Sequence, residues 1–469
     1  MSRSRAHAGA LVVLLAIASA PAQEPFAALV VADAVPLLAH ADATVRGEAA
    51  LVVSPGADLA LQDRLLALAA DPEPAARHRA LIALGLLGTP GAVRFLGDCL
   101  AATSARVEDD GIAAAFGLGL VADHAASSTN TQLMSRIAQG SWKRQRDLLL
   151  ALLLGMTFHP DRAEVSAMRQ LFEDSSNRDP EVRGLLLRHL LANDRTFDDK
   201  LLRRLLERGS LPEREAVLHH LAGSSRALDS GWCDALAELA VHGEPGEHRA
   251  LALAALTRVR WLPALDLALR AMRGGTPAEC AQAMRTMMQI GGARLLRAAA
   301  PRLIAERDPA RKQALLAGYE APLDAEFADH LARLAADGSE PWSLRNTAAI
   351  VLARAGCDRA APLLRDAFRS TGDDRTLDRL AAALQASHGE PVALARLLDA
   401  GVSLPQATAR FAALVRAGHP EAERVLLAQL RPGGNALAAL RAFRATRVLA
   451  LPAARDEAVP TLLRELLGS

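Results

Sequence analysis

Residues 340–364 read EPWSLRNTAAIVLARAGCDRAAPLL, and the order of residue types in this stretch decides the fold. The pair Glu340 and Pro341 is typical of a helix start, because an acid caps the helix and proline tolerates its first turn. Apolar residues then follow at the spacing of one helix face, and these are Leu344, Ala348, Val351 and Leu352. Gly356 predicts a left-handed stop, and a second helix starts around Pro362. The stretch therefore predicts two short helices joined by a turn.

One proline pattern repeats along the chain. Each copy has apolar residues before a proline and a leucine soon after it, and the copies lie at Pro36, Pro263, Pro301, Pro362 and Pro460. Their spacings of 227, 38, 61 and 98 residues fit seven, one, two and three units of about 33 residues. In each copy we expect the proline in the first turn of a helix, where its missing N–H costs little.

A second pattern marks the other helix of each unit. An acid, often followed by proline, precedes an arginine and a row of alanines and leucines, with clear copies at Asp42, Asp71-Pro72 and Asp179-Pro180. We expect the acid to cap the helix, the proline to take its first position, and Gly85, like Gly356, to end it. Each unit is thus an αα-hairpin, whose proline-pattern helix we name the first helix and whose acid–arginine helix we name the second helix.

The two patterns together, Asp-Pro-x-x-Val-Arg and then Ala-Val-Pro-x-Leu-Leu, resemble the HEAT repeat, in particular its short bilin-lyase-like variety. The resemblance implies an all-α fold, an α–α superhelix (solenoid) of about 13 helical hairpins over residues 23–469. It also implies that the acids cap second helices and that the arginines bond along the stack. By resemblance these structural roles fall to Asp42, Arg46, Asp71, Arg77, Asp179, Arg183 and Arg345.

Residues 101–160 depart from the repeat pattern. The apolar stretch 107–121 contains Gly117 and Gly119, but it lacks the third glycine and the preceding strand of a dinucleotide-binding loop. For these glycines we expect close packing or a helix irregularity. Residues 127–131 are polar and predict a loop. We therefore expect distorted hairpins in this part of the array.

The first 22 residues have the three parts of a secretory signal peptide. Arg3 and Arg5 form its positive start, and residues 8–18 form an apolar run that is shorter than the roughly 20 residues of a membrane span. Small residues then precede an expected cleavage before Gln23. The sequence therefore predicts an exported protein, periplasmic or extracellular, with no membrane span after cleavage.

The charge balance argues against a nucleic-acid partner. Without Arg3 and Arg5 the basic count falls from 54 to 52, against 53 acidic residues, whereas nucleic-acid binding calls for a basic excess. The four cysteines lie far apart and form no C-x-x-C. We expect them to be buried free thiols, although export would permit oxidation of a pair.

Catalytic and metal-binding motifs are weak in this sequence. The tripeptide of residues 159–161, His-Pro-Asp, matches the J-domain signature but lacks a basic helix before it. The histidines form no H-E-x-x-H, and no G-x-S-x-G nucleophile elbow occurs. Two basic clusters, at residues 144–146 and 203–204, fit solvated helix faces, with a small anion site as the alternative. The sequence predicts no cofactor and favours a protein that is not an enzyme.

The predicted function is a non-catalytic extracytoplasmic scaffold that holds a protein or peptide partner on a concave face lined by second helices. The candidate partner-binding patch lies on successive second helices and consists of Arg188, His189, Arg214, His219, His220 and Arg249. The alternative, implied by the bilin-lyase-like repeats, is a lyase or a chaperone of cofactor attachment, against which the predicted export counts. A HEAT-fold DNA glycosylase is disfavoured by near-neutral charge, by export and by few aromatic residues.

Overall fold

The structure is a computed structural model of the chain. It describes residues 30–54, 59–102, 109–121, 127–139, 142–158, 164–174, 179–193, 199–224, 227–370, 377, 379–383, 410, 413, 414, 424, 427–446 and 463. The predicted signal peptide and the tripeptide 159–161 lie outside these residues. The regular structure of the described residues is helical throughout, which confirms the all-α prediction.

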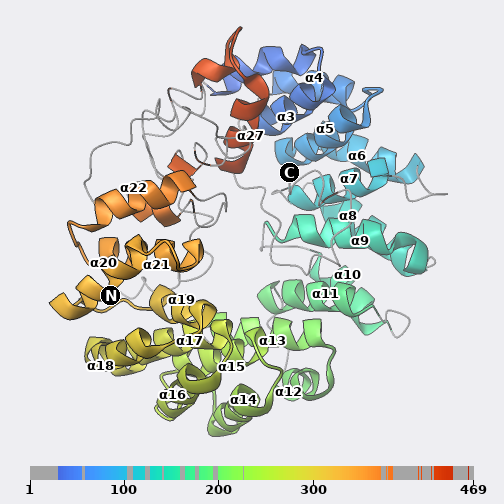
Figure 1. Cartoon of the computed structure of the whole chain (residues 1–469). Helices are drawn as coiled ribbons and strands as arrows, with labels where there is room; N and C mark the ends of the chain where they lie inside the picture. Colours follow the sequence, from blue (N-terminus) through green and yellow to red (C-terminus); the bar gives the residue numbers. More distant parts are fainter. Residues whose placement is uncertain are drawn as a thin grey trace, which may run out of the picture. The chain divides into compact units, whose positions relative to one another are not determined.

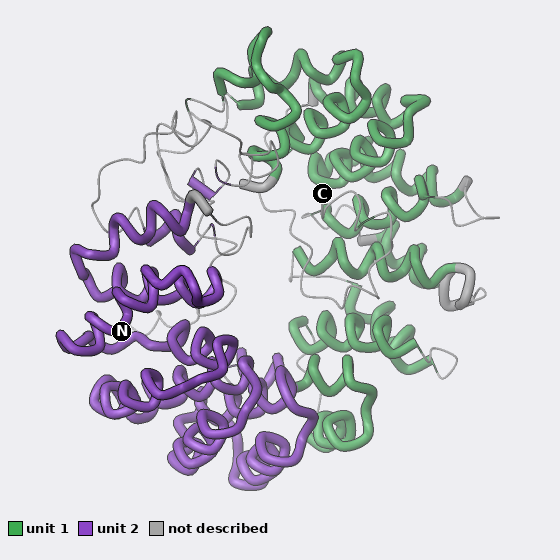
Figure 2. Tube along the Cα trace, in the orientation of Figure 1, with its two compact units in different colours: residues 1–217, 423–469 green, residues 218–422 purple. Residues whose placement is uncertain are grey.

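The chain divides into two compact units (Figure 2). Unit 1 consists of residues 1–217 and 423–469, and unit 2 consists of residues 218–422. Unit 1 is therefore discontinuous in sequence, because unit 2 is inserted between its two segments. The predicted array over residues 23–469 is thus divided between two units.

Unit 1 alternates first and second helices (Figure 1). In chain order they are η2 (Val35–Ala39), α3 (Ala43–Val53), α4 (Leu59–Leu68), α5 (Pro74–Leu87), α6 (Pro90–Ala102), α7 (Asp109–Leu120), α8 (Ser127–Gln139), α9 (Trp142–Met156), α10 (Val165–Glu173), α11 (Pro180–Asn193), α12 (Asp199–Arg208), the start of α13 (Leu211–Gly223) and α27 (Ala436–Thr446). The second helices α3, α5, α7 and α9 pack on one another in that order, and α4, α6 and α8 pack on their partners α5, α7 and α9.

Unit 2 continues the same alternation after the end of α13. Its helices are α14 (Ser230–His242), α15 (Glu247–Arg258), α16 (Ala264–Gly274), α17 (Pro277–Thr286), the short π-helix η5 (Met287–Gly291), α18 (Gly292–Ala305), α19 (Pro309–Ala317), α20 (Ala325–Ala336), α21 (Trp342–Arg354) and α22 (Ala360–Ser370). The second helices α15, α17, α19 and α21 pack on one another in that order.

First and second helices bury different shares of their surface. In the first helix α12, Leu202, Leu205 and Leu206 are buried, whereas Lys200 and Arg204 are exposed. This is the one-sided apolar stripe of a helix that covers a core. In the second helix α7, every residue from Gly111 to Leu120 is buried. Since ten successive residues cover all sides of a helix, α7 is enclosed by its neighbours.

Helix ends follow the predicted signals in part. The side chain of Asp42 caps α3 by accepting a hydrogen bond from the Thr44 N–H at 2.7 Å. Gly356 follows α21 with a φ of 71°, as a left-handed stop requires. Pro362 lies in the first turn of α22, whereas Pro301 lies inside α18, so its predicted place in a first turn is wrong.

Both predicted ends of α5 are wrong. The helix begins at Pro74 instead of Pro72, because the Asp71 carboxylate accepts a backbone N–H two residues on and forms a turn first. It ends at Gly88, which has a φ of 66°. Gly85 lies inside the helix, where a Cβ would overlap the backbone of α7. Gly85 is therefore a packing residue and not a stop.

The described residues of the stretch 101–160 include the helices α7, α8 and α9. The polar residues 127–131 begin α8, so the predicted loop is wrong. Gly117 and Gly119 do serve close packing. A Cβ at Gly117 would lie 2.7 Å from the carbonyl oxygen of Leu81 in α5, and one at Gly119 would overlap the backbone of α9. Within the described residues, the sequence of this stretch differs from the repeat pattern because glycines stand where the second helices approach closely.

The C-terminal helix α27 belongs to unit 1 and packs on α3, the first of the second helices. α3 therefore has a helical neighbour on two sides, α5 and α27. The contact joins segments from opposite ends of the sequence. It also assembles the most buried charged cluster described below.

Candidate functional site

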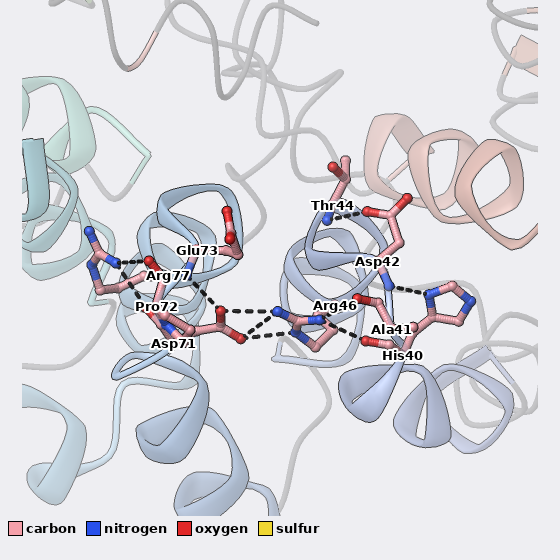
Figure 3. Close-up of polar contacts among 9 residues, drawn as sticks. All are labelled: His40, Ala41, Asp42, Thr44, Arg46, Asp71, Pro72, Glu73 and Arg77. Carbon is pink, nitrogen blue, oxygen red and sulfur yellow. Dashed lines mark hydrogen bonds and ion pairs between the residues drawn. The ribbon is translucent and has the colours of Figure 1, made fainter.

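In unit 1, the arginine near the start of a second helix reaches the acid at the start of the next one. Arg46 Nε and Nη2 donate to the Asp71 carboxylate at 2.9 and 3.0 Å, and Arg46 Nη1 donates to the His40 carbonyl at 2.8 Å (Figure 3). Arg77 repeats this geometry with the Asp110 carboxylate at 2.9 Å and with the Asp71 carbonyl at 2.8 Å. Each arginine thus ties its own interhelical turn to the next hairpin.

Two more pairs continue this row in unit 1. Arg146 donates to Asp179, and Arg183 Nε donates to Glu213 Oε1 at 2.9 Å. Arg183 also lies over the Phe172 ring, 4.5 Å from its centroid. Sequence motifs identified Asp179 and Arg183, but they missed Arg146 and Glu213 because neither stands in an acid–proline–arginine sequence. These residues align hairpins and form no open site.

In unit 2, arginines at the equivalent position bind backbone carbonyls. Arg249 Nε donates to the Gly243 carbonyl at 2.8 Å, and Arg345 Nε donates to the Ala335 carbonyl at 3.1 Å. The acid Glu279 accepts a hydrogen bond from the Gly246 backbone N–H at 2.7 Å. The two arginines thus bind within their own hairpins, and of these three residues Glu279 is the one that links neighbouring hairpins.

A buried charged cluster joins α3, α5 and α27. Glu48 is 0% exposed, and Arg79 and Arg444 are 6% and 8% exposed. Glu48 Oε1 lies 3.3 Å from Arg79 Nε and 3.9 Å from Arg441 Nε, and Glu48 Oε2 lies 3.2 Å from Arg444 Nε. One carboxylate thus faces three guanidinium groups from two other helices.

The cluster carries more positive than negative charge in a buried place. Burial lowers the pKa of Arg79, Glu48 opposes this effect, and Arg444 and Arg441 add to it. Arginine nevertheless stays charged in proteins, so Glu48 is the group that makes the approach of three cations tolerable. We assign the cluster the role of holding α27 against α3. No pattern in the sequence pointed to it.

Three residues of the predicted partner-binding patch belong to unit 1. His189 is buried, and its Nε2 lies 2.9 Å from the Leu153 carbonyl oxygen of α9, so it links two second helices in the interior. Arg188 and Arg214 are half-buried on α11 and α13. Partner binding by Arg188 and Arg214 stays a prediction. His189 is too buried to contact a partner directly.

The other three residues of the predicted patch belong to unit 2. His219 is exposed, and its Nε2 lies 4.0 Å from Glu247 Oε1. His220 is half-buried, and burial together with the charge of Arg258 lowers its pKa. Arg249 turns to the Gly243 carbonyl. Of these three side chains, His219 is the exposed one.

An accessible row of side chains exists on the second helices of unit 2. On α15 the exposed or half-exposed residues Glu247, Leu251, Ala254 and Arg258 follow one another at steps of four, three and four, so they share one side of the helix. On α17, which packs on α15, Ala281 is half-exposed and Arg285 is exposed. Together with His219 they form a surface that we name the unit 2 face.

Cysteines and possible metal ligands add no second site. The four cysteines are free, with Cys233 and Cys280 buried and Cys99 and Cys357 half-buried; burial raises the pKa of the Cys233 and Cys280 thiols. Among the described residues no group of three or more His, Cys, Asp or Glu side chains is placed to hold a metal ion. No described helix is long and apolar enough to cross a membrane.

Comparisons with known proteins give little beyond the helices themselves. No protein-family model matches the sequence, and no curated protein sequence matches it. Among solved structures, human deoxyhypusine hydroxylase in complex with glycerol is similar at 15% identity, with a TM-score of 0.24 over 70% of this chain and 96% of that chain. A TM-score of this size carries no argument, so the repeat assignment rests on the hairpins of this chain.

Proposed function

We propose that the protein is a non-catalytic scaffold of the HEAT type, acting outside the cytoplasm, that binds a protein or peptide partner on the unit 2 face. The observation that carries the proposal is the accessible row on α15 and α17. The second helices of a stacked array usually supply its binding surface, and α15 and α17 leave side chains accessible, whereas α7 of unit 1 is buried from Gly111 to Leu120.

The chemistry of the unit 2 face fits a polypeptide. Leu251, Ala254 and Ala281 offer a shallow apolar strip, and Glu247 and Arg285 place opposite charges beside it. An apolar centre with a polar rim is the usual composition of a protein interface. The small alanines leave room for the side chains of a partner. We expect the charged residues Glu247 and Arg285 to fix the position of the partner along the surface.

Site-specific photo-crosslinking tests the surface. A photoreactive amino acid at Leu251 and, separately, at Ala281 should give the same crosslinked partner in the native organism. A matched position on a first helix, Arg302 of α18, is exposed and should give none. Crosslinks of equal yield from Arg302, or different species from Leu251 and Ala281, would reject the unit 2 face.

Charge reversal gives a second measurement on the same surface. The Arg285→Glu substitution should lower the crosslinking yield from Leu251 about tenfold, since an interface charge is replaced by its opposite. The Arg302→Glu control should leave that yield unchanged. Equal yields in both variants would show that the partner does not use the charged rim.

The extracytoplasmic location is a separate part of the proposal. It is supported by Arg3, Arg5 and the apolar run of residues 8–18, which have the composition of a signal peptide. N-terminal sequencing of the protein from the native organism should begin at Gln23. An intact Met1 would place the scaffold inside the cell and leave the unit 2 face to be tested on its own.

A further inference from the structure

Three large hydrophobic side chains are exposed among the described residues, and two of them lie on α16 and in the turn before it. Leu262, in the turn before the helix, is 70% exposed, and Leu269 is 37% exposed. The third is Trp342, at the start of α21. Leu262 stands two positions before the first helical residue, Ala264, and Leu269 lies in the second turn of the helix. The half-exposed Leu265 lies beside them.

The turn before this face contains a strained arginine. Arg260 has a φ of 53° and is the one non-glycine residue with positive φ in the described part of the chain. Its N–H bonds to the Thr257 carbonyl at 2.9 Å, and the Trp261 N–H bonds to the Leu256 carbonyl at 3.1 Å, so Arg260 holds the left-handed position of a Schellman motif. The equivalent position after α21 is occupied by Gly356.

Glycine is favoured at that position because a Cβ is strained there. An arginine that keeps an unfavourable backbone conformation points to a use for its side chain. The Arg260 side chain is exposed, and its turn joins α15 to α16. The strain and the exposed leucines are independent observations, and they meet in one corner of unit 2.

The charges around the leucines are mostly positive. Arg260, Arg270 and Arg273 are exposed, and the one exposed acid of residues 258–274 is Asp266. Arg273 lies four residues after Leu269 and Asp266 lies three residues before it, so both share its face, while Arg270, the next residue, lies about 100° around the helix. The corner thus combines projecting apolar side chains with a net charge that attracts anions.

We propose that this corner binds the surface of a membrane that contains anionic lipids. Leu262 projects from a turn, and a projecting apolar side chain enters the boundary between headgroups and acyl chains. The guanidinium groups of Arg260, Arg270 and Arg273 bind lipid phosphates at the same depth. An acidic peptide is the less suitable occupant, because peptides are usually held in concave sites.

Vesicle co-sedimentation of the full chain tests the proposal. The protein should bind vesicles of phosphatidylglycerol and phosphatidylcholine in low salt, and it should not bind phosphatidylcholine alone. The Leu262→Ser, Leu269→Ser double variant should bind at least tenfold more weakly, and Arg273→Gln about fivefold more weakly. Trp342→Ser and Arg302→Gln are matched controls on other helices and should bind as the parent does.

Arg260 supplies the sharpest variant. Arg260→Gly should raise the Tm by about 1–2 °C, because strain is relieved, and should weaken vesicle binding about fivefold, because a charge is lost. Arg260→Lys should leave the Tm and the vesicle binding at the values of the parent protein. A higher Tm with unchanged binding, or no binding to anionic vesicles, would overturn the proposal. So would polyglutamate binding that survives in the leucine double variant. None of these outcomes bears on the unit 2 face.

Discussion

The second helices of the two units share one sequence pattern but differ in how much of their surface is buried. In unit 1, α5 buries every residue from His78 to Gly85, and α7 buries every residue from Gly111 to Leu120. In unit 2, α15 leaves one side accessible, from Glu247 to Arg258. α21, later in unit 2, is again buried over seven successive residues. The difference shows that a repeat pattern fixes the hairpin but not whether its second helix is available for binding.

Two features separate the enclosed helices from the accessible ones. Unit 1 places glycine at the helix contacts, where Gly85 and Gly117 face each other, and it links successive hairpins by arginine–acid pairs. In unit 2, Arg249 and Arg345 bind carbonyls of their own hairpin regions. We infer that unit 1 is the stability-determining part of the chain and that unit 2 carries the binding surface.

The largest expected effect is that of Glu48→Ala. The substitution leaves three guanidinium groups without their carboxylate, and breaking a buried ion cluster costs about 3–5 kcal/mol of unfolding free energy. The measurement is urea unfolding followed by circular dichroism. Glu247→Ala, on the unit 2 face, is the control and should change stability by less than about 0.5 kcal/mol. Equal effects would remove the distinction between the units.

Gly85→Ala should have the next largest effect and lower the free energy of unfolding by about 3 kcal/mol. The new Cβ would overlap the backbone of Gly117, and overpacking against backbone cannot be relieved by turning a side chain. Gly274→Ala in unit 2 is the control, because nothing lies within 4 Å of its Cβ position. A tolerated Gly85→Ala would mean that α5 and α7 do not need their close approach.

Asp110→Ala should lower stability by about 1 kcal/mol, since Arg77 and His78 lose a shared partner on a partly exposed edge. Asp109→Ala removes the neighbouring exposed acid and should change the free energy of unfolding by less than about 0.5 kcal/mol. Thermal unfolding of both variants distinguishes the two residues. A larger effect from Asp109 would show that helix-start charge, and not the arginine pair, stabilises this edge.

The smallest expected effect concerns pH. Burial and Arg258 hold the pKa of His220 below its usual value of 6.5. The folded state therefore binds fewer protons than the unfolded state, so this stabilisation is present above pH 6.5 and is lost as pH falls through the lowered pKa. His220→Gln should remove less than about 1 kcal/mol of the acid-induced loss between pH 7.5 and 5.5. An unchanged pH profile would contradict this assignment.

Local patterns predicted local structure well. Hairpin order, the Asp42 cap and the Gly356 stop follow from residues a few positions apart, and the motif also singled out Arg46, Asp71 and Arg183. Gly85 misled as a stop because a glycine at a helix contact and a glycine at a helix end look alike until the neighbouring helix is known. The loop predicted at residues 127–131 failed because a polar stretch can begin a first helix whose outer side is solvated.

The candidate sites were less predictable. Glu48 lies in an alanine-rich helix, and its partners Arg441 and Arg444 come from the other end of the chain, so no spacing rule connects them. The predicted patch mixed inward and outward positions, because His189 and His219 have the same chemistry but opposite burial. The periodic row of Glu247, Leu251, Ala254 and Arg258 was the signal that could have found the unit 2 face.

The packing of α27 on α3 has a consequence for biogenesis. A ribosome makes α3 before unit 2, but it makes α27, the helix that packs on one side of α3, only after the whole of unit 2. Contacts between such distant segments form late and slow the completion of folding. We therefore expect the side of α3 that packs on α27 to stay open in a nascent chain until α27 has been made.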